Sequence, residues 1–462
     1  MSVILRPYQQ KLVDGIRSAF RAGKRAPLVV SPTGSGKTVT FSYIAENAAS
    51  KGNKVWILAH REELLDQISA SLSRFNLRHG MIAAGRTPDP FAPAQVASVQ
   101  TLVRRLSDVQ APDLIICDEA HHAAAGSWGK ILQAFPKART LGFTATPERL
   151  DGKGLGDAFD DIVMGPSVSW LIQNGFLCKP VYYAPSSIDV SSMRRTAGDF
   201  NKSDAELAVD KPVITGCAVS HYKKICDGVP AIAFCASVRH AEHVAQQFNE
   251  AGYRFAVIEG RLEKNKRKEL VKKLSNGDLH GLTSCDIVSE GFDLPIVTAA
   301  IMLRPTSSLS LYLQQVGRAL RPHDTKTNAI ILDHVGNVLR HGFAEDIRDW
   351  SLEGAKQRKK SDKEKALPMK QCPSCYGIHA PASHCPLCGH EHGIKARQLE
   401  QVEGELQALT SEDIIAKSRR RDQGKAKTLH ELIELGKKRG YRNPAAWASH
   451  IIRARGYGAE RN

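Results

Sequence analysis

No stretch of this sequence approaches the roughly 18 consecutive apolar residues that a membrane-spanning helix needs, so we expect no membrane partner. The first ten residues lack a positively charged segment followed by an apolar one, and we expect a cytoplasmic protein without a secretion signal. Acidic residues are too few to balance the basic ones. The chain has 48 Asp and Glu against 64 Lys and Arg, a net charge of +16 that points to a polyanionic partner.

Cysteines in the paired arrangement typical of disulfides are scarce over most of the chain. Six of the ten stand singly in apolar or helical stretches, which favours reduced thiols in a cytosolic protein. The apolar content of 42% and the charged content of 24% are ordinary for a globular protein, and 462 residues allow two to four domains. The six single cysteines are Cys117, Cys178, Cys217, Cys226, Cys235 and Cys285.

A phosphate-binding loop is predicted at residues 31–38, Ser-Pro-Thr-Gly-Ser-Gly-Lys-Thr, between an apolar strand and a helical pattern. Glycines let backbone N–H groups crowd a phosphate, and the helix N-terminus adds positive potential. We expect Lys37 to reach the β- and γ-phosphates of ATP and Thr38 to hold Mg²⁺. The strict pattern has glycine in place of Ser31, and a chance glycine turn is the alternative. The candidate contacts are Thr33, Gly34, Ser35, Gly36, Lys37 and Thr38.

A candidate site for the adenine lies upstream of this loop. Residues 5–10, Leu-Arg-Pro-Tyr-Gln-Gln, precede a helical pattern, and a simple helix start is the alternative explanation. Because an amide pairs with adenine N6 and N7, Gln9 is a candidate adenine reader. The flat guanidinium of Arg6 is suited to lie against the adenine face.

Two carboxylates follow the apolar strand at 114–117, in the order Asp118-Glu119-Ala120-His121. Carboxylates at the end of a buried strand are costly unless a cation lies there, and Mg²⁺ on a triphosphate is such a cation. We expect Asp118 to hold the metal through water and Glu119 to polarise the attacking water.

Other polar residues follow two further strands of the same half. Parallel sheets bind ligands at these strand ends, although helix capping is the commoner explanation for each residue alone. The candidates are His60 and Arg61 after the strand at 55–59, and Gln100 and Thr101 after the strand at 95–99.

A second α/β unit begins near residue 181 and has no phosphate loop. Strands alternating with helices predict another parallel sheet. The expected strands are 231–235, 255–258, 281–284, 298–303 and 329–332.

Two polar motifs accompany this second unit, Ser-Glu-Gly-Phe-Asp-Leu-Pro at 289–295 and Gln-Gln-Val-Gly-Arg-Ala-Leu-Arg at 314–321. On a helix, Gln314, Arg318 and Arg321 would share one face. That face is either a solvated basic surface or one that meets another domain, where arginine stabilises the transition state at a γ-phosphate.

In order and spacing, these motifs resemble the series found in superfamily-two helicases of the DExH type, over roughly residues 1–345. The start resembles the adenine-reading motif of the branch shared with type III restriction translocases. The resemblance implies two RecA-like lobes that clamp ATP and ratchet along a nucleic-acid strand. It further implies that Arg318 and Arg321 are arginine fingers, that Asp293 lies near the ribose, and that Gly291 belongs to the ATP-binding residues. His121 would link the acidic motif to Gln314. The residues implied to touch the nucleic-acid backbone are His60, Arg61, Gln100 and Thr101.

Four cysteines follow a basic, hydrophilic linker. They form two C-x-x-C pairs nine residues apart, which suits four thiolates around a tetrahedral, structural Zn²⁺. A pair of disulfides is the alternative, and a neighbouring histidine (379, 384, 390 or 392) is a possible substitute ligand. The expected zinc ligands are Cys372, Cys375, Cys385 and Cys388.

The basic tail has two amphipathic helical patterns, around residues 429–435 and 447–452. They are typical of a nucleic-acid grip or a small docking domain, and a solvated basic bundle explains them equally well. The order of core, linker, four-cysteine module and tail resembles the bacterial RadD family. That resemblance implies a role in DNA repair or recombination and a link to the single-stranded-DNA-binding protein.

The sequence therefore predicts an α/β protein with two RecA-like parallel-sheet domains in tandem, a small zinc module and a helical tail. The resemblance implies an ATP-dependent DNA helicase or translocase that uses ATP, Mg²⁺ and Zn²⁺ and acts as a monomer. An RNA helicase, a translocating subunit of a restriction enzyme, and a nucleotide-gated DNA-binding protein without strand separation are the alternatives. We expect an ATP-binding domain at 1–180, a helicase C-terminal domain at 181–350, a basic linker at 351–370, the zinc module at 371–392 and the tail at 393–462.

Overall fold

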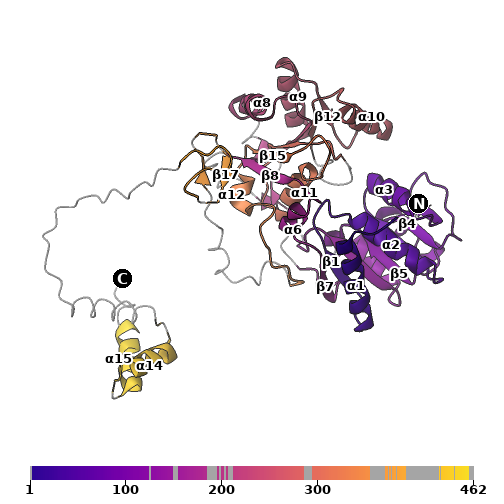
Figure 1. The fold of residues 1–462 in the computed structure, drawn as a ribbon. Helices are drawn as coiled ribbons and strands as arrows, with labels where there is room; N and C mark the ends of the chain where they lie inside the picture. Colours follow the sequence, from indigo (N-terminus) through magenta and orange to yellow (C-terminus); the bar gives the residue numbers. More distant parts are fainter. Residues whose placement is uncertain are drawn as a thin grey trace. The chain divides into compact units, whose positions relative to one another are not determined.

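The computed structural model divides into two compact units, residues 1–393 and residues 394–462. The first contains two lobes, each built on one sheet (Figure 1). The structure describes residues 3–123, 126–148, 154–184, 195–196, 199–201, 204–206, 212–285, 294–353, 370–372, 374–375, 377–380, 382–391, 426, 428–441 and 443–456.

The first lobe is a sheet of seven parallel strands in the order β3-β4-β2-β5-β6-β1-β7. Its central strands are buried along their whole length because helices cover both faces. The strands are β1 (Pro27–Val30), β2 (Val55–Ala59), β3 (His79–Ile82), β4 (Ala94–Ser98), β5 (Leu114–Cys117), β6 (Arg139–Thr144) and β7 (Asp161–Met164). The helices are α1 (Pro7–Arg21), α2 (Lys37–Ala49), α3 (Glu62–Arg74), α4 (Val99–Leu102) and α5 (Ser127–Ala134), with short 3₁₀ turns at Leu106–Asp108 and Ala120–His122.

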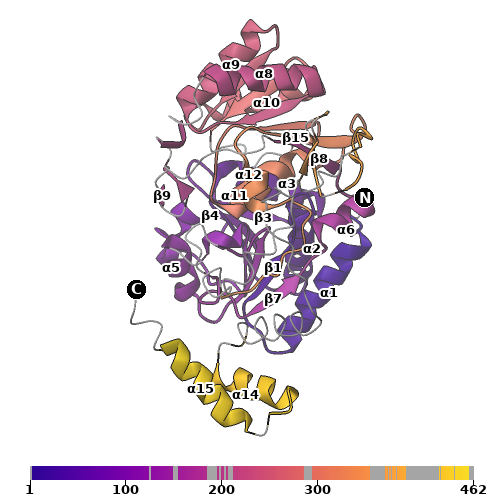
Figure 2. The ribbon, with the colours of Figure 1, turned by 90° about the vertical axis from the view of Figure 1, so that its left-hand side faces the viewer.

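The second lobe is an eight-stranded sheet in the order β12-β13-β11-β14-β15-β8-β17-β16. Six strands are parallel, and β17 and β16 extend the edge in antiparallel fashion. Helices α8 and α9 cover one face, and α10 and α11 cover the other. Figure 2 shows α8, α9 and α10 at the top of the view, with α11 and α12 below them. The strands are β8 (Lys179–Tyr183), β11 (Ala231–Phe234), β12 (Phe255–Ile258), β13 (Gly281–Ser284), β14 (Ala299–Met302), β15 (Asn328–Asp333), β16 (Lys370–Gln371) and β17 (Gly377–His379). The helices are α6 (Val168–Gln173), α8 (Pro212–Cys226), α9 (Val238–Glu250), α10 (Lys264–Ser275), α11 (Leu309–Ala319) and α12 (Asn337–His341), and a small hairpin joins β9 (Arg195–Thr196) to β10 (Asp199–Phe200).

The predicted fold class, two RecA-like parallel sheets in tandem, is confirmed. The sequence prediction missed seven strands, namely β3, β7, β8, β9, β10, β16 and β17. It was also wrong about the helix that carries the arginines. That helix, α11, ends at Ala319, so Arg321 follows the helix and does not share its face with Gln314 and Arg318.

Among the described residues, two crossings of the chain between the lobes can be followed, and both border one small cavity. The first crossing follows β7, and the second runs from Phe343, packed on the second lobe, to Leu352, packed on the first. The Gly156 amide donates to the Leu352 carbonyl at 3.0 Å and fixes that end. Residues 164–168 and 344–350 both line a cavity of about 170 Å³ behind the phosphate loop.

The second unit contains two helices, α14 (Leu429–Lys438) and α15 (Pro444–Gly456), and confirms the predicted helical tail. A capping box of Thr428 and Glu431 begins α14. Leu432 and Ala448 are fully buried where the helices meet. Arg419, Arg420 and Arg421, three consecutive basic residues of the tail, lie outside the described residues.

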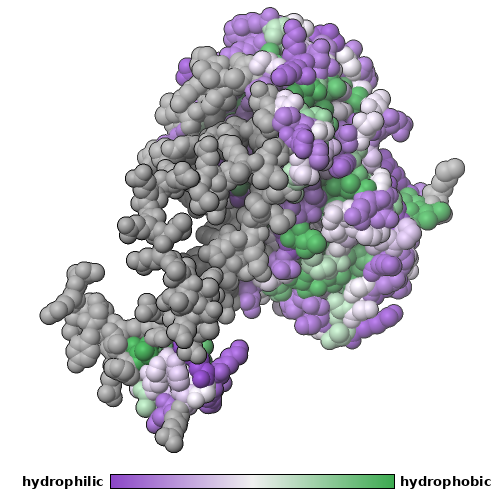
Figure 3. Space-filling model, turned by 60° about the vertical axis from the view of Figure 1, so that its left-hand side comes forward, coloured by the Kyte–Doolittle hydropathy of each residue, from purple (hydrophilic) through white to green (hydrophobic). Residues whose placement is uncertain are grey.

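On the face shown in Figure 3, hydrophilic side chains surround smaller hydrophobic patches. In the part of the chain that the structure describes, no helix combines the length and apolar character needed to cross a membrane.

Candidate functional site

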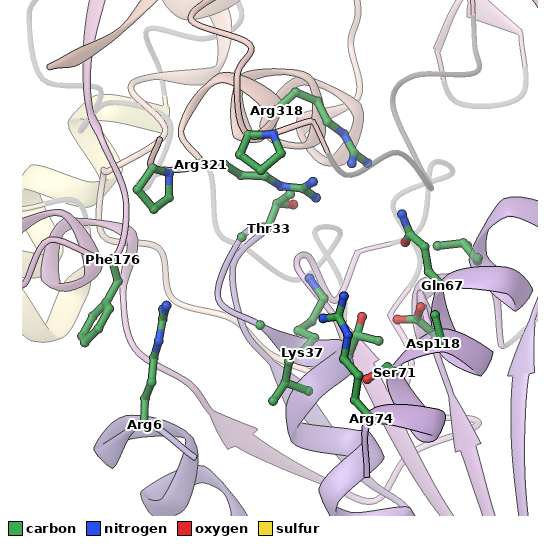
Figure 4. A pocket seen from close by; sticks show the side chains of 18 of the residues that line it. Arg6, Thr33, Lys37, Gln67, Ser71, Arg74, Asp118, Phe176, Arg318 and Arg321 are labelled. Carbon is green, nitrogen blue, oxygen red and sulfur yellow. The ribbon is translucent and has the colours of Figure 1, made fainter. Parts of the chain in front are cut away.

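The two lobes enclose a cavity of about 550 Å³. Figure 4 shows Arg318 and Arg321 of the second lobe on the side opposite Lys37, with Arg6 and Phe176 at one end and Asp118 at the other. The lining residues are Arg6, Thr33, Gly34, Gly36, Lys37, Thr38, Val39, Leu64, Gln67, Ala70, Ser71, Arg74, Asp118, Glu119, Phe176, Pro295, Arg318, Arg321 and Pro322.

The loop between β1 and α2 has the backbone of a phosphate cradle. Gly34 and Gly36 have φ angles of 85° and 78°, a left-handed conformation that favours glycine. Gly36 is also the N-cap of α2, so the next amide groups belong to the helix N-terminus. This arrangement suits an anion, because unpaired N–H groups and the helix dipole point the same way.

Ser31 replaces the usual glycine for a visible reason. Its hydroxyl donates to the Ser35 hydroxyl at 2.7 Å, and that hydroxyl donates to the Pro32 carbonyl at 2.7 Å. Ser31 is almost fully buried, and a side chain at Gly165 would collide with it. The serine therefore braces the loop without entering the cavity.

Lys37 lies at the centre of the charges in the cavity. Its Nζ donates to the Ser31 carbonyl at 3.2 Å. Burial lowers the pKa of its ammonium, Glu119 and Asp118 oppose that shift, and the arginines of the second lobe add to it. The ammonium thus interacts electrostatically with two carboxylates of its own lobe and with two guanidinium groups of the other lobe.

The acidic loop after β5 holds Glu119 in an unusual backbone conformation. Its φ and ψ are both 51°, a left-handed state that costs a non-glycine residue about 1–2 kcal/mol. Such strain persists where the surrounding structure enforces it, and it is frequent at functional sites. The Glu119 Oε2 lies 3.4 Å from His121 Nδ1, and that nitrogen lies 3.2 Å from Thr144 Oγ1.

Helix α11 brings the arginine-bearing segment against the phosphate loop. A Cβ on Gly317 would lie 2.8 Å from the Thr33 Cβ, so the close approach requires glycine. Gln314 and Arg318 are buried on this helix, with 3% and 6% exposure. The predicted interface with another domain therefore exists. The predicted His121–Gln314 link and the roles of these residues stay predictions.

A half-buried lysine, Lys326, holds the segment around Arg321 beyond the helix end. Lys326 Nζ donates to three carbonyl oxygens, those of Arg321 at 2.7 Å, Ala319 at 2.8 Å and Pro295 at 2.9 Å. Burial lowers the pKa of Lys326 to about 8, which leaves the ammonium charged at neutral pH. Charge-assisted bonds of this kind are about twice as strong as neutral ones.

At the adenine end, the structure ties Gln9 to the protein itself. Its amide donates to the Gly36 carbonyl at 3.3 Å and accepts from the Arg6 amide at 2.9 Å. The Arg6 guanidinium lies over the Phe176 ring, 4.7 Å from its centroid, and both residues line the cavity. Adenine reading by Arg6 and Gln9 stays a prediction, and Phe176 is a flat apolar surface that the sequence reasoning missed. Gly291 and Asp293 lie outside the described residues.

Three of the four predicted nucleic-acid contacts are joined at adjacent strand ends. Gln100 Nε2 donates to the His60 carbonyl at 3.2 Å, and Arg61 Nε donates to His60 Nε2 at 3.3 Å. Thr101 lies next to Gln100 on α4. The parallel pairing of β2 with β4 creates this cluster.

Helix α3 contributes polar lining residues that no motif marked. Gln67, Ser71 and Arg74 recur at i, i+4 and i+7, beside the buried apolar face of the helix. That spacing was readable from the sequence, but a polar helical stripe is far more often solvated. The same helix carries ion pairs to α10 of the other lobe, Glu62 with Lys264 at 2.9 Å and Glu63 with Arg267 at 2.6 Å.

The four predicted zinc ligands come together in the first unit. All four sulfur atoms lie within 4.8 Å of one another. The Cys372–Cys388 and Cys375–Cys385 distances between sulfur atoms are each 3.7 Å. A tetrahedron with Zn–S bonds of about 2.3 Å has edges of about 3.8 Å, so the residues fit a zinc ion. The same distances are too long for disulfide bonds, and no histidine joins this cluster among the described residues.

Two family models match the chain. The model described as "Type III restriction enzyme, res subunit" matches residues 2–149, and the one described as "Helicase conserved C-terminal domain" matches residues 219–323. They correspond to the two lobes that form the cavity.

Individual proteins are similar over longer spans. A 51.5 kDa protein of a Lactococcus phage is 37% identical over 392 residues, covering 84% of this chain and 83% of the phage protein. A candidate ATP-dependent helicase of Saccharomyces cerevisiae, IRC3, is 31% identical over 72% of this chain, which spans only 52% of that protein. A fragment of a candidate HsdR subunit of a type I restriction enzyme from Vibrio vulnificus shares the fold, with a TM-score of 0.59, 22% identity, and coverage of 76% of this chain and 67% of the fragment.

We predict one Zn²⁺ per chain, measured by elemental analysis of the purified protein. A double substitution, Cys372→Ser with Cys385→Ser, should abolish binding, because two remaining thiolates cannot close a tetrahedral site. Cys226→Ser, at a buried cysteine outside the cluster, is the matched control and should keep the metal. Full zinc occupancy in the double variant would show that the ligands are misassigned.

We predict that Arg318→Ala lowers kcat for nucleoside triphosphate hydrolysis by on the order of 10³, because arginines supplied across a cleft stabilise transition-state charge. Steady-state kinetics of the full chain measure this. Arg254→Ala is the control, since Arg254 of the same lobe bonds the carbonyls of Gly277 and Asp278. Unchanged kcat in Arg318→Ala would remove the arginine from the reaction.

Proposed function

We propose that this chain, which belongs to the superfamily-two helicase-like ATPases of the restriction-enzyme and IRC3-like group, uses ATP hydrolysis to move along DNA. It is a nucleic-acid-dependent ATPase with one module of the type III restriction kind and one helicase C-terminal module. The phage relative at 37% identity is similar to this chain over 84% of its length.

One observation carries the proposal: the two lobes place opposite charges around a single cavity. Lys37, Asp118 and Glu119 come from the first lobe, and Arg318 and Arg321 from the second. A triphosphate bound to the first lobe attracts the arginines of the second lobe, and this attraction favours closure of the cleft. Hydrolysis weakens the attraction, because the phosphate charge is divided between two products. Repeated closing and opening is the motion that translocation needs.

Each residue then has a distinct task. We assign phosphate binding to Lys37 and the loop amides, orientation of the attacking water to Glu119, and transition-state stabilisation to Arg318 with Arg321. The hydroxyl of Thr38 and the carboxylate of Asp118 suit Mg²⁺, which would neutralise triphosphate charge when bound. At the base end, Arg6 and Phe176 offer flat surfaces to adenine.

DNA is favoured over RNA by the restriction-enzyme names of several relatives, including a type I restriction subunit of Escherichia coli at 25% identity. The net charge of +16 suits either polyanion. We further propose that the chain is a member of the RadD family, and the four-cysteine module and the basic tail after the two lobes support this. Under this proposal the chain is a cytoplasmic monomer that acts in DNA repair or recombination and contacts the single-stranded-DNA-binding protein.

ATPase rates measured with single-stranded DNA, duplex, forked DNA and RNA test the function. We expect DNA to stimulate turnover more than RNA does. Glu119→Gln should retain ATP binding and lose turnover by 10²-fold or more, because the amide cannot accept the water proton. Stimulation by RNA alone would make the chain an RNA helicase, and normal turnover in Glu119→Gln would overturn the assigned base.

The separate second unit generates a further prediction. Lys437, Lys438 and Arg439 follow one another at the end of α14. Phosphate contacts release counterions, so each contact on a single strand adds about −0.7 to the salt slope of binding. Lys437→Gln with Lys438→Gln should flatten the slope by about 1.4, and removal of residues 394–462 should flatten it by at least as much. If the salt slope does not change, the tail does not contact the nucleic acid, and binding of a protein partner becomes its proposed role.

A further inference from the structure

Three imidazole rings in a row connect the predicted nucleic-acid face with the acidic loop. The centroid of the His60 ring, just after β2, lies 4.5 Å from the centroid of the His122 ring, and the two ring planes make an angle of 62°. The His122 ring lies 4.1 Å from the His121 ring, at 41°. His121 Nδ1 is 3.4 Å from the Glu119 Oε2. The row therefore starts at the His60–Arg61–Gln100 cluster and ends at the proposed base.

The hydrogen-bond donors fix the two outer rings. Arg61 Nε can only donate, so His60 Nε2 is the acceptor of this hydrogen bond. The Thr144 hydroxyl donates to the Thr146 carbonyl at 2.8 Å, so its oxygen accepts from His121 Nδ1. His121 Nδ1 therefore carries a proton that faces both Thr144 and Glu119. His122 is the ring between these two oriented neighbours.

The far end of the row also reaches the second lobe. Thr146, which bonds Thr144 through its amide and carbonyl, donates its hydroxyl to the Ser310 hydroxyl at 2.6 Å. Ser310 lies on α11, the helix that carries Arg318. A displacement of His121 would thus disturb its contact with Glu119, the proposed base. Through Thr144 and Thr146 it would also disturb the contact with Ser310 of the second lobe.

We propose that His122 is a positioning residue that couples nucleic-acid binding at His60 to the placement of Glu119. Rings in van der Waals contact in a packed interior cannot shift independently, so a contact that moves His60 moves His122 and then His121. The inference rests on the proposed function, because it requires that nucleic acid stimulate hydrolysis. Coupling between sites typically changes a response by roughly 5- to 150-fold.

The test compares ATP turnover with and without saturating oligodeoxythymidylate, and the measured quantity is the ratio of the two rates. His122→Ala should lower that ratio about tenfold relative to the wild type. His122→Phe should restore most of it, because a phenyl ring maintains contact with both neighbours. Partial misfolding would lower both rates in proportion and leave the ratio unchanged.

Matched variants separate coupling from packing. His79→Ala removes another half-buried histidine of the first lobe, one that bonds Ser69 and the Leu77 carbonyl, and should keep the wild-type ratio. His122→Gln, which lacks a ring, should behave like His122→Ala and replaces it if the alanine variant does not fold. An equal ratio in wild type, His122→Ala and His122→Gln would overturn the inference alone. A wild-type ratio near one would overturn the proposed function, and the inference with it.

Discussion

The close approach of α11 to the phosphate loop sets the geometry of the whole cleft. Gly317 lets the helix backbone lie directly against Thr33, and any side chain there would collide with it. This contact holds Arg318 and Arg321 within electrostatic reach of Lys37. A larger residue at 317 would push the helix outward and carry both guanidinium groups away from the phosphates. The chemistry of the site thus depends on the absence of one side chain.

The cysteine cluster is a continuation of the second lobe's sheet. Strand β17, between the two cysteine pairs, pairs with β8, which would otherwise be the edge of the parallel sheet. Burial, followed by the neighbouring Cys375 thiol, raises the pKa of Tyr183 on β8, which shows how closely the cluster lies against this strand. An exposed edge strand invites pairing with other chains, and the small module covers it. A metal that orders the module therefore also protects the sheet.

The sequence predicted the parts of the fold whose signal is local. Strands β1, β2 and β5 agree residue for residue, because buried parallel strands are continuous apolar runs. β3 and β7 lie at the sheet edges with half-exposed patterns, and β17 pairs only through a distant contact. In the site, the phosphate loop and acidic motif were readable because each is one contiguous segment. Phe176 and Arg74 line the cavity because of how their segments pack in the folded protein. No motif around either residue in the sequence indicates this position.

Two chain crossings between the lobes line the small cavity behind the phosphate loop, and their placement bears on how the lobes can move. Both connections border the same cavity, so they can act together as one hinge between the lobes. We expect them to allow rotation about the line that joins them more readily than sliding of one lobe across the other. The small space between them leaves room for that rotation. Each opening of the cleft would then follow a similar arc, and each closing would return Arg318 to its place opposite Lys37.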